Sequence, residues 1–66
     1  MIISNFTQIE IDYLLQKCNF TALERELFLY RAKGISLDVI SEKLSISRDW
    51  AGKLSQRVNK KIIKIL

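Results

Sequence analysis

Four helix-start signals follow one another along this chain, and they restrict its fold more than any other feature. Thr7 and Thr21 each stand three residues before a glutamate, which is the capping-box pattern. Ser36 and Ser47 can each cap a further helix, because a serine hydroxyl accepts a hydrogen bond from the free N–H groups of the first turn. Apolar residues at three- and four-residue spacing follow each signal. The pattern predicts helices over residues 7–18, 21–33, 36–44 and 47–64.

The spacing of apolar residues also predicts which side of each helix faces the core. In the second helix, Leu23, Leu27 and Tyr30 share the inward stripe and Phe28 lies beside it. Gly34 follows this helix and can take the positive φ with which helices commonly end. The inward stripe of the fourth helix consists of Ala51, Leu54, Val58, Ile62 and Ile65.

Length and composition are those of one small helical domain. The chain has 66 residues, of which 48% are hydrophobic, with two glycines and no proline. A chain this short has a marginal core, so the high apolar fraction is what allows it to fold. We therefore expect a single all-α domain over residues 1–66, a compact four-helix domain containing a helix-turn-helix.

The residue types that support catalysis or metal binding are scarce. The chain has no histidine that could activate a serine, Ser36 and Ser47 stand at helix starts, and the acidic residues are scattered over helical faces. Its one cysteine, Cys18, lies on a core stripe and cannot form an internal disulfide. No apolar run approaches the roughly 20 residues of a membrane span, and no signal-peptide core is present. We expect a cytoplasmic protein that is not an enzyme, with no cofactor, no metal and no membrane partner.

Positive charge is confined to the second half of the chain. Residues 1–33 carry four basic and four acidic side chains, whereas residues 34–66 carry seven basic and three acidic ones. The whole net charge of +4 therefore belongs to the second half. Such asymmetry favours a polyanionic partner, although a basic face that is merely solvated is the alternative explanation.

Two segments resemble a known DNA-binding domain. Residues 34–47 read Gly-x-Ser-x-x-x-Ile-x-x-x-Leu-x-Ile-Ser, and residues 20–26 read Phe-Thr-x-x-Glu-Arg-Glu. The first resembles the G-x-S-x-x-E-I-A-x-x-L-x-I-S core, and the second the L-T-x-x-E-R-E opening, of the helix-turn-helix domain shared by the C-terminal region of sigma factors and LuxR-type regulators. The resemblance covers residues 20–62. We expect no LuxR-type terminal helix, so the sigma-like variant is the closer one.

The chain departs from the family pattern at several positions. Val39 stands where the family usually has Glu, Ser41 where it has Ala, and Ser45 where the turn commonly has Gly. Trp50-Ala51 replaces the usual Thr-Val pair. We expect these substitutions to preserve the fold. A DNA-sequence preference shared with the family is less readily preserved.

The resemblance implies that the fourth helix enters the major groove of double-stranded DNA. It places Arg48, Asp49 and Lys53 at positions that the family uses for base contacts. Arg48 could bind guanine through two hydrogen bonds, and Asp49 could accept one from cytosine N4. Lys53 or Gln56 could read bases further along. Each of these charged residues could instead only solubilise a surface helix.

Other residues of the fourth helix suit the DNA backbone. Arg57, Lys60 and Lys61 are placed for phosphates, where each would add salt-dependent affinity. Ser47 is first a helix cap and could also touch a phosphate. Gly52 is unfavourable inside a helix by about 1 kcal/mol relative to alanine, so it marks either a close approach of DNA or protein, or no function.

Trp50 has two roles open to it. Its ring could lie over the edge between the third and fourth helices, or it could contact a thymine methyl group, a sugar or another protein. It stands one residue before the core stripe of the fourth helix, and that position is compatible with both.

The C-terminal residues are apolar on more than one side. Ile63 and Leu66 lie off the core stripe of the fourth helix. We expect Phe6, Ile9 and Tyr13 to cover them within one chain; homodimerisation is the next alternative.

The sequence as a whole predicts a small DNA-binding transcriptional regulator. Ten Ile and seven Lys residues point to a bacterial or phage origin with low GC content. The alternative is a protein-binding adaptor of the same fold, which docks on a partner such as RNA polymerase through Trp50 and the apolar C-terminal tail. A domain this small makes few contacts with DNA. Homodimerisation, or recruitment by RNA polymerase, would raise its affinity for DNA.

Overall fold

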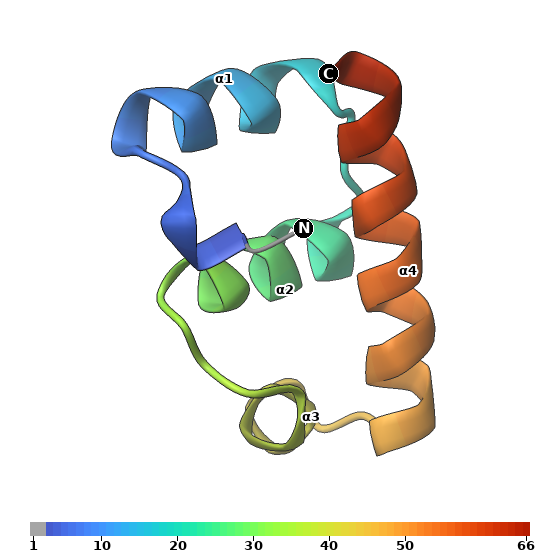
Figure 1. The fold of residues 1–66 in the computed structure, drawn as a ribbon. Helices are drawn as coiled ribbons and strands as arrows, with labels where there is room; N and C mark the ends of the chain where they lie inside the picture. Colours follow the sequence, from blue (N-terminus) through green and yellow to red (C-terminus); the bar gives the residue numbers. More distant parts are fainter. Residues whose placement is uncertain (1–2) are drawn as a thin grey trace.

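Four α-helices and a short 3-10 helix make up residues 3–66, the part of the chain that the computed structural model describes (Figure 1). This confirms the predicted all-α, four-helix class. The longest helix has 18 residues and is about 27 Å long, so it runs nearly the full 28 Å length of the domain. The elements are η1 (Ile3–Asn5), α1 (Gln8–Lys17), α2 (Ala22–Ala32), α3 (Leu37–Leu44) and α4 (Arg48–Ile65).

The four helix starts use the capping residues that the sequence predicts. The Thr7 and Thr21 hydroxyls accept hydrogen bonds from the backbone three residues on, and the glutamates there accept one from each threonine N–H at 2.9 Å. Ser36 and Ser47 cap α3 and α4 in the same way through their hydroxyls. Each start is thus determined by contacts that span only three residues.

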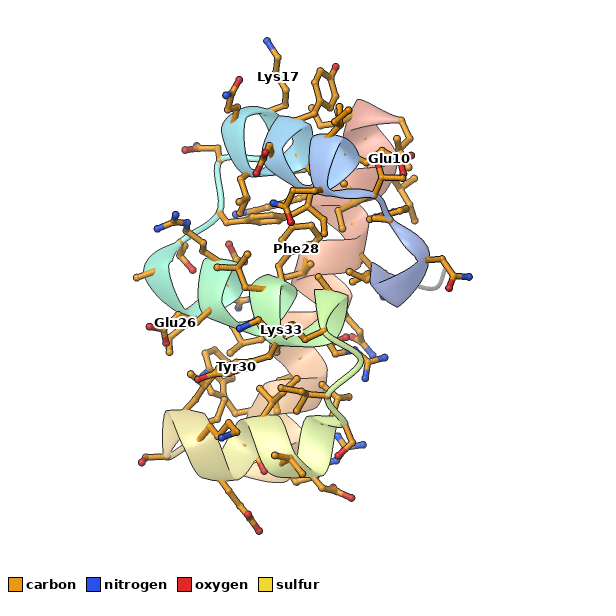
Figure 2. The ribbon with its side chains drawn as sticks, turned by 90° about the vertical axis from the view of Figure 1, so that its left-hand side faces the viewer. Glu10, Lys17, Glu26, Phe28, Tyr30 and Lys33 are labelled. Carbon is orange, nitrogen blue, oxygen red and sulfur yellow. The ribbon has the colours of Figure 1, made fainter. Side chains whose placement is uncertain are left out.

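Helices α1, α2 and α3 are stacked along one side of α4 (Figures 1 and 2). The centre of the core is α2, whose Leu27 and Phe28 are fully buried. Along α4, the buried positions are those of the predicted stripe, except that Ile65 is only partly buried. The buried residues of α4 are Ala51, Leu54, Val58 and Ile62.

The inward stripe predicted for α2 is confirmed at Leu27, which is fully buried, and is wrong at Leu23. Leu23 is exposed, whereas Phe28 is fully buried with its ring centroid 5.2 Å from that of Phe20. The reason is that Glu24, and not Leu23, occupies the inward position of the first turn, where it is paired with Lys61. The buried line of α2 therefore runs from residue 24 to residue 28.

The predicted cover of the C-terminal residues is also wrong. Phe6 packs against the core, but Ile9 is 81% exposed and Leu66 is 78% exposed. Helix α1 buries Ile11 and Leu14. Since residues two apart on a helix point in nearly opposite directions, Ile9 faces away from the core when Ile11 faces into it. Tyr13 is half exposed for the same reason.

None of the helices within residues 3–66 combines the length and the apolar composition that crossing a membrane requires.

Candidate nucleic-acid interface

The turn between α3 and α4 comprises residues 45–47. Ser45 takes the left-handed conformation, with φ of 57°, and the Ile46 N–H donates to the Ser41 carbonyl at 3.0 Å. This six-to-one hydrogen bond after a left-handed residue is the Schellman ending of a helix. Ile46 is partly buried against the core. The turn therefore sets the direction in which α4 leaves α3.

Ser41 is a polar residue on the inward side of α3. Its side chain is buried, and its hydroxyl donates to the Asp38 carbonyl at 2.7 Å. A buried hydroxyl that is hydrogen-bonded carries little penalty, so the serine leaves the packing of α3 intact.

The outward half of α4 is strongly basic. Lys53, Arg57, Lys60 and Lys64 are exposed there, and Asp49 is the acidic residue among them. At about 100° per residue, these positions share the half of the helix opposite the buried stripe, whereas the exposed Arg48 lies at the edge of that half, beside α3. Gln56 is exposed on the same half, and Gly52 lies partly buried between Arg48 and Gln56. The side chains predicted to contact bases are thus brought together on one surface.

Arg48 is held by α3 rather than pointing freely away. Its Nε donates to Asp38 Oδ1 at 2.7 Å, and both side chains are largely exposed. An exposed ion pair of this kind contributes between zero and about 1 kcal/mol, so exchanging Asp38 for another acceptor requires little free energy. The amino-acid sequence does not predict this pairing, because Asp38 is also explained by its place in the first turn of α3.

Trp50 and Arg57 form a second pair on α4. The guanidinium carbon of Arg57 lies 5.3 Å from the centre of the indole ring, within cation–π range. Trp50 itself is partly buried and packs against the hydrophobic core. Trp50 therefore positions the Arg57 guanidinium group at the edge of the basic surface.

Lys61 has a different environment from the phosphate-binding role predicted for it. Its Nζ donates to Glu24 Oε1 at 2.6 Å and to the Asn19 carbonyl at 3.2 Å. Glu24 is only 2% exposed, so removing its cation would leave a buried carboxylate without a counter-charge. Lys61 is therefore a structural residue that joins α4 to the start of α2, and we exclude it from the candidate interface.

The pairing with Lys61 affects the pKa of the Glu24 carboxyl group. Burial by itself raises the pKa of the carboxyl group, but the hydrogen bonds from Lys61 and the Thr21 backbone, with the charge of Lys61, outweigh it. The net result is a lowered pKa. Glu24 therefore stays ionised in the folded protein.

Gly52 has no role in the packing of the folded chain. A Cβ atom built there would meet only Nη1 of Arg48, at the ordinary contact distance of 3.6 Å. Any requirement for glycine at this position must therefore come from a molecule that approaches α4 from outside. Ser47, the cap of α4, is exposed at the same end of the helix.

Comparison of the chain with family models, with curated proteins and with solved structures finds no match. The function is therefore inferred from the geometry and charge of α3 and α4.

Proposed function

We propose that this protein is a small DNA-binding transcriptional regulator in which α3 and α4 act as a sigma-like helix-turn-helix. The observation that carries the proposal is the outward half of α4, where four cations accompany one carboxylate. A single helix of this kind fits the major groove, which is about 12 Å wide. The tight turn before α4 supports the proposal, because it presents the first turns of that helix at one end of the domain (Figure 1).

In the proposed complex, the first turns of α4 read base edges. Arg48 exchanges the carboxylate of Asp38 for guanine O6 and N7, and Asp49 accepts a hydrogen bond from cytosine N4. Lys53 and Gln56, one and two turns further along, reach the neighbouring base pairs. The weak, exposed pair with Asp38 keeps the Arg48 guanidinium ordered before DNA arrives.

The remaining residues of the interface bind or admit the DNA backbone. Arg57, supported by Trp50, and Lys60 lie further along α4 and neutralise phosphates. Gly52 lets the backbone approach the helix closely, and Ser47 contributes its hydroxyl at the N-terminal end. We place this regulator in the cytoplasm of a bacterium or in a phage-infected cell.

The first experiment is selection of a preferred duplex from random DNA, followed by titrations at several salt concentrations. Arg48→Ala should relax the base preference at one position and cost about 1–3 kcal/mol on the selected site. Lys60→Ala should weaken binding to every duplex and reduce the salt slope by about one, because one phosphate contact is lost.

The matched control is Lys33→Ala. Lys33 is exposed at the end of α2, on the side of the molecule away from α4 (Figure 2). This variant lowers the net charge as Lys60→Ala does, but it should leave the salt slope unchanged. Equal and weak affinity of the wild type for all duplexes at physiological salt would refute the proposal, as would equal effects of the two lysine variants.

A second candidate function is supported by the exposed end of α4. Ile63 and Leu66 are 63% and 78% exposed, which suits a protein-binding adaptor that docks on a partner such as RNA polymerase. Trp50 gives less support to the adaptor function, because its ring packs on the core and lies in cation–π contact with Arg57. Retention of RNA polymerase binding in Arg48→Ala and its loss in Leu66→Ser would identify the adaptor.

A further inference from the structure

The charges around the N-terminal end of α4 differ from those along the rest of the helix. Arg48 is accompanied there by two exposed carboxylates, those of Asp38 on α3 and of its neighbour Asp49. Residues 50–66, in contrast, contain five basic side chains and no acidic one. The first turn of α4 therefore attracts phosphate groups less strongly than the rest of the helix does.

The Arg48 side chain has neighbours in two directions. Its Nε donates to Asp38 Oδ1 at 2.7 Å, and its Nη1 lies 3.6 Å from the place that a Cβ atom of residue 52 would take. The guanidinium group thus lies along α4 with a carboxylate on its α3 side. The Asp38 side chain is 82% exposed, so the packing of α3 does not require its charge.

A carboxylate in this position affects phosphate and guanine differently as ligands of Arg48. A phosphate oxygen bound to Arg48 would lie within about 6 Å of the Asp38 carboxylate, because both anions would contact the same guanidinium group. Two negative charges at this distance repel each other. Guanine O6 and N7 are neutral acceptors, so Arg48 can bind them without this repulsion.

We propose that Asp38 is a specificity-determining residue, which keeps Arg48 from binding phosphates and leaves it available for base edges. The inference rests on the proposed DNA-binding function and assigns Asp38 a part in it. Where the duplex offers guanine, Arg48 leaves the carboxylate for O6 and N7. Where it does not, the alternative ligand is a phosphate, and Arg48 stays with Asp38. A nonspecific duplex therefore gains no affinity from Arg48.

The phosphate contacts are then made by cations further along α4. Within residues 3–66, neither Arg57 nor Lys60 forms an ion pair with a carboxylate. A phosphate bound to either of them meets no anion comparable to Asp38. Binding to a nonspecific duplex should therefore depend on Arg57 and Lys60, and its salt dependence should contain no contribution from Arg48.

The test compares the Kd for the selected duplex with the Kd for a duplex of random sequence, at several salt concentrations. Asp38→Asn should lower the ratio of nonspecific to specific Kd by about two- to fivefold, the equivalent of about 0.4–1 kcal/mol. It should also steepen the salt slope on the random duplex by about 0.9, because Arg48 gains one phosphate contact there. The salt slope on the selected duplex should stay the same.

The matched control is Glu42→Gln, which removes one negative charge from another exposed position on α3. It should change both Kd values by the same factor. The Arg48→Ala background separates the proposed role from a structural one. Without the arginine, Asp38→Asn should leave the ratio of the two Kd values unchanged, because there is no guanidinium group for a phosphate to bind. Circular dichroism should show equal helix content in all variants, since the three side chains are exposed.

The possible outcomes separate this inference from the proposed function. A wild type that binds both duplexes equally would refute the proposed function, and the role of Asp38 with it. A wild type with a clear preference, whose ratio is the same in Asp38→Asn and Glu42→Gln, would overturn the role of Asp38 alone. Weaker binding of Asp38→Asn to the selected duplex only would also overturn it, and would show that the carboxylate orients Arg48 toward guanine instead.

Discussion

At the N-terminal end of α4, residues that the fold requires alternate with residues that it does not. Ala51 is fully buried, and its neighbour Trp50 packs on the core, so both positions are explained by folding. Gly52 and Lys53 follow at once, and neither is required by a contact within the chain. This alternation is expected of a helix that has one buried and one exposed face. Because folding does not require the exposed residues, a binding function is the remaining reason for their identity.

Substitution of Gly52 by alanine separates the fold from the interface. Gly52→Ala should raise the free energy of unfolding by about 1 kcal/mol, because alanine is the better helix former and its Cβ meets only Arg48 Nη1 at 3.6 Å. If the DNA backbone approaches α4 here, the same variant should bind DNA more weakly although it is more stable. Urea unfolding and DNA titration measure the two effects.

The other glycine supplies the control for this prediction. Gly34 has φ of 81°, so Gly34→Ala should lower the free energy of unfolding by about 1 kcal/mol and leave DNA affinity unchanged. Unchanged DNA binding by Gly52→Ala would show that no ligand approaches closely at this position.

At the scale of elements, the three-residue turn controls how α4 is presented. Its first residue, Ser45, takes a left-handed conformation, and Asn19 takes the same conformation after α1. Asparagine tolerates that conformation well, whereas serine does so at a cost of about 1–2 kcal/mol. The turn therefore carries a local strain that glycine at this position would not have.

Ser45→Gly should therefore stabilise the protein by up to about 1 kcal/mol, since relief of the left-handed strain is partly offset by the entropy that glycine loses on folding. Thermal unfolding followed by circular dichroism measures the change. Ser47→Ala is the contrasting variant two residues away. It should destabilise the protein by about 1 kcal/mol, because the hydroxyl that accepts from the Trp50 N–H is lost. Stabilisation by both variants would contradict the assigned roles.

At the scale of the whole molecule, one buried ion pair joins segments that are far apart in sequence. Lys61 near the end of α4 binds Glu24 in the first turn of α2 and the carbonyl of Asn19 before it. The same carboxylate completes the capping box of α2 with Thr21. Glu24 therefore couples the start of one helix to the position of another.

This coupling should make stability depend on pH. The pKa of Glu24 is lowered in the folded protein, so its contribution is present above the ordinary carboxyl pKa of about 4.3 and is lost as pH falls through the folded-state value. Glu24→Gln should therefore flatten the acid side of the curve of unfolding free energy against pH. Glu42→Gln, at an exposed position on α3, is the control and should retain the wild-type curve. Equal curves for the wild type and Glu24→Gln would contradict the linkage.

Removal of the cation tests the same pair from the other side. Lys61→Ala should lower the free energy of unfolding by about 2 kcal/mol. That is less than the roughly 3–5 kcal/mol for a fully buried pair, because the lysine side chain is 34% exposed. Lys64→Ala, at an exposed position in the last turn of the same helix, should change stability by less than about 0.5 kcal/mol.

The starts of the helices, and the position of the basic surface on α4, follow from the amino-acid sequence. A cap such as Thr21 and its glutamate act over three residues, and the inward stripe of α4 follows from helical spacing alone, so neither needs knowledge of the rest of the chain. Structure that depends only on residues close together in the chain can be predicted from a single sequence.

The packing of the helices sets which of their charged side chains are paired and which apolar side chains remain exposed. The Glu24–Lys61 pair joins residues 37 positions apart, and the Arg48–Asp38 pair crosses from one helix to another. The exposure of Ile9 and Leu66 depends on how α1 is rotated against α4. Such contacts arise from the packing of whole helices, because the position and rotation of each are set by all the residues that it buries together.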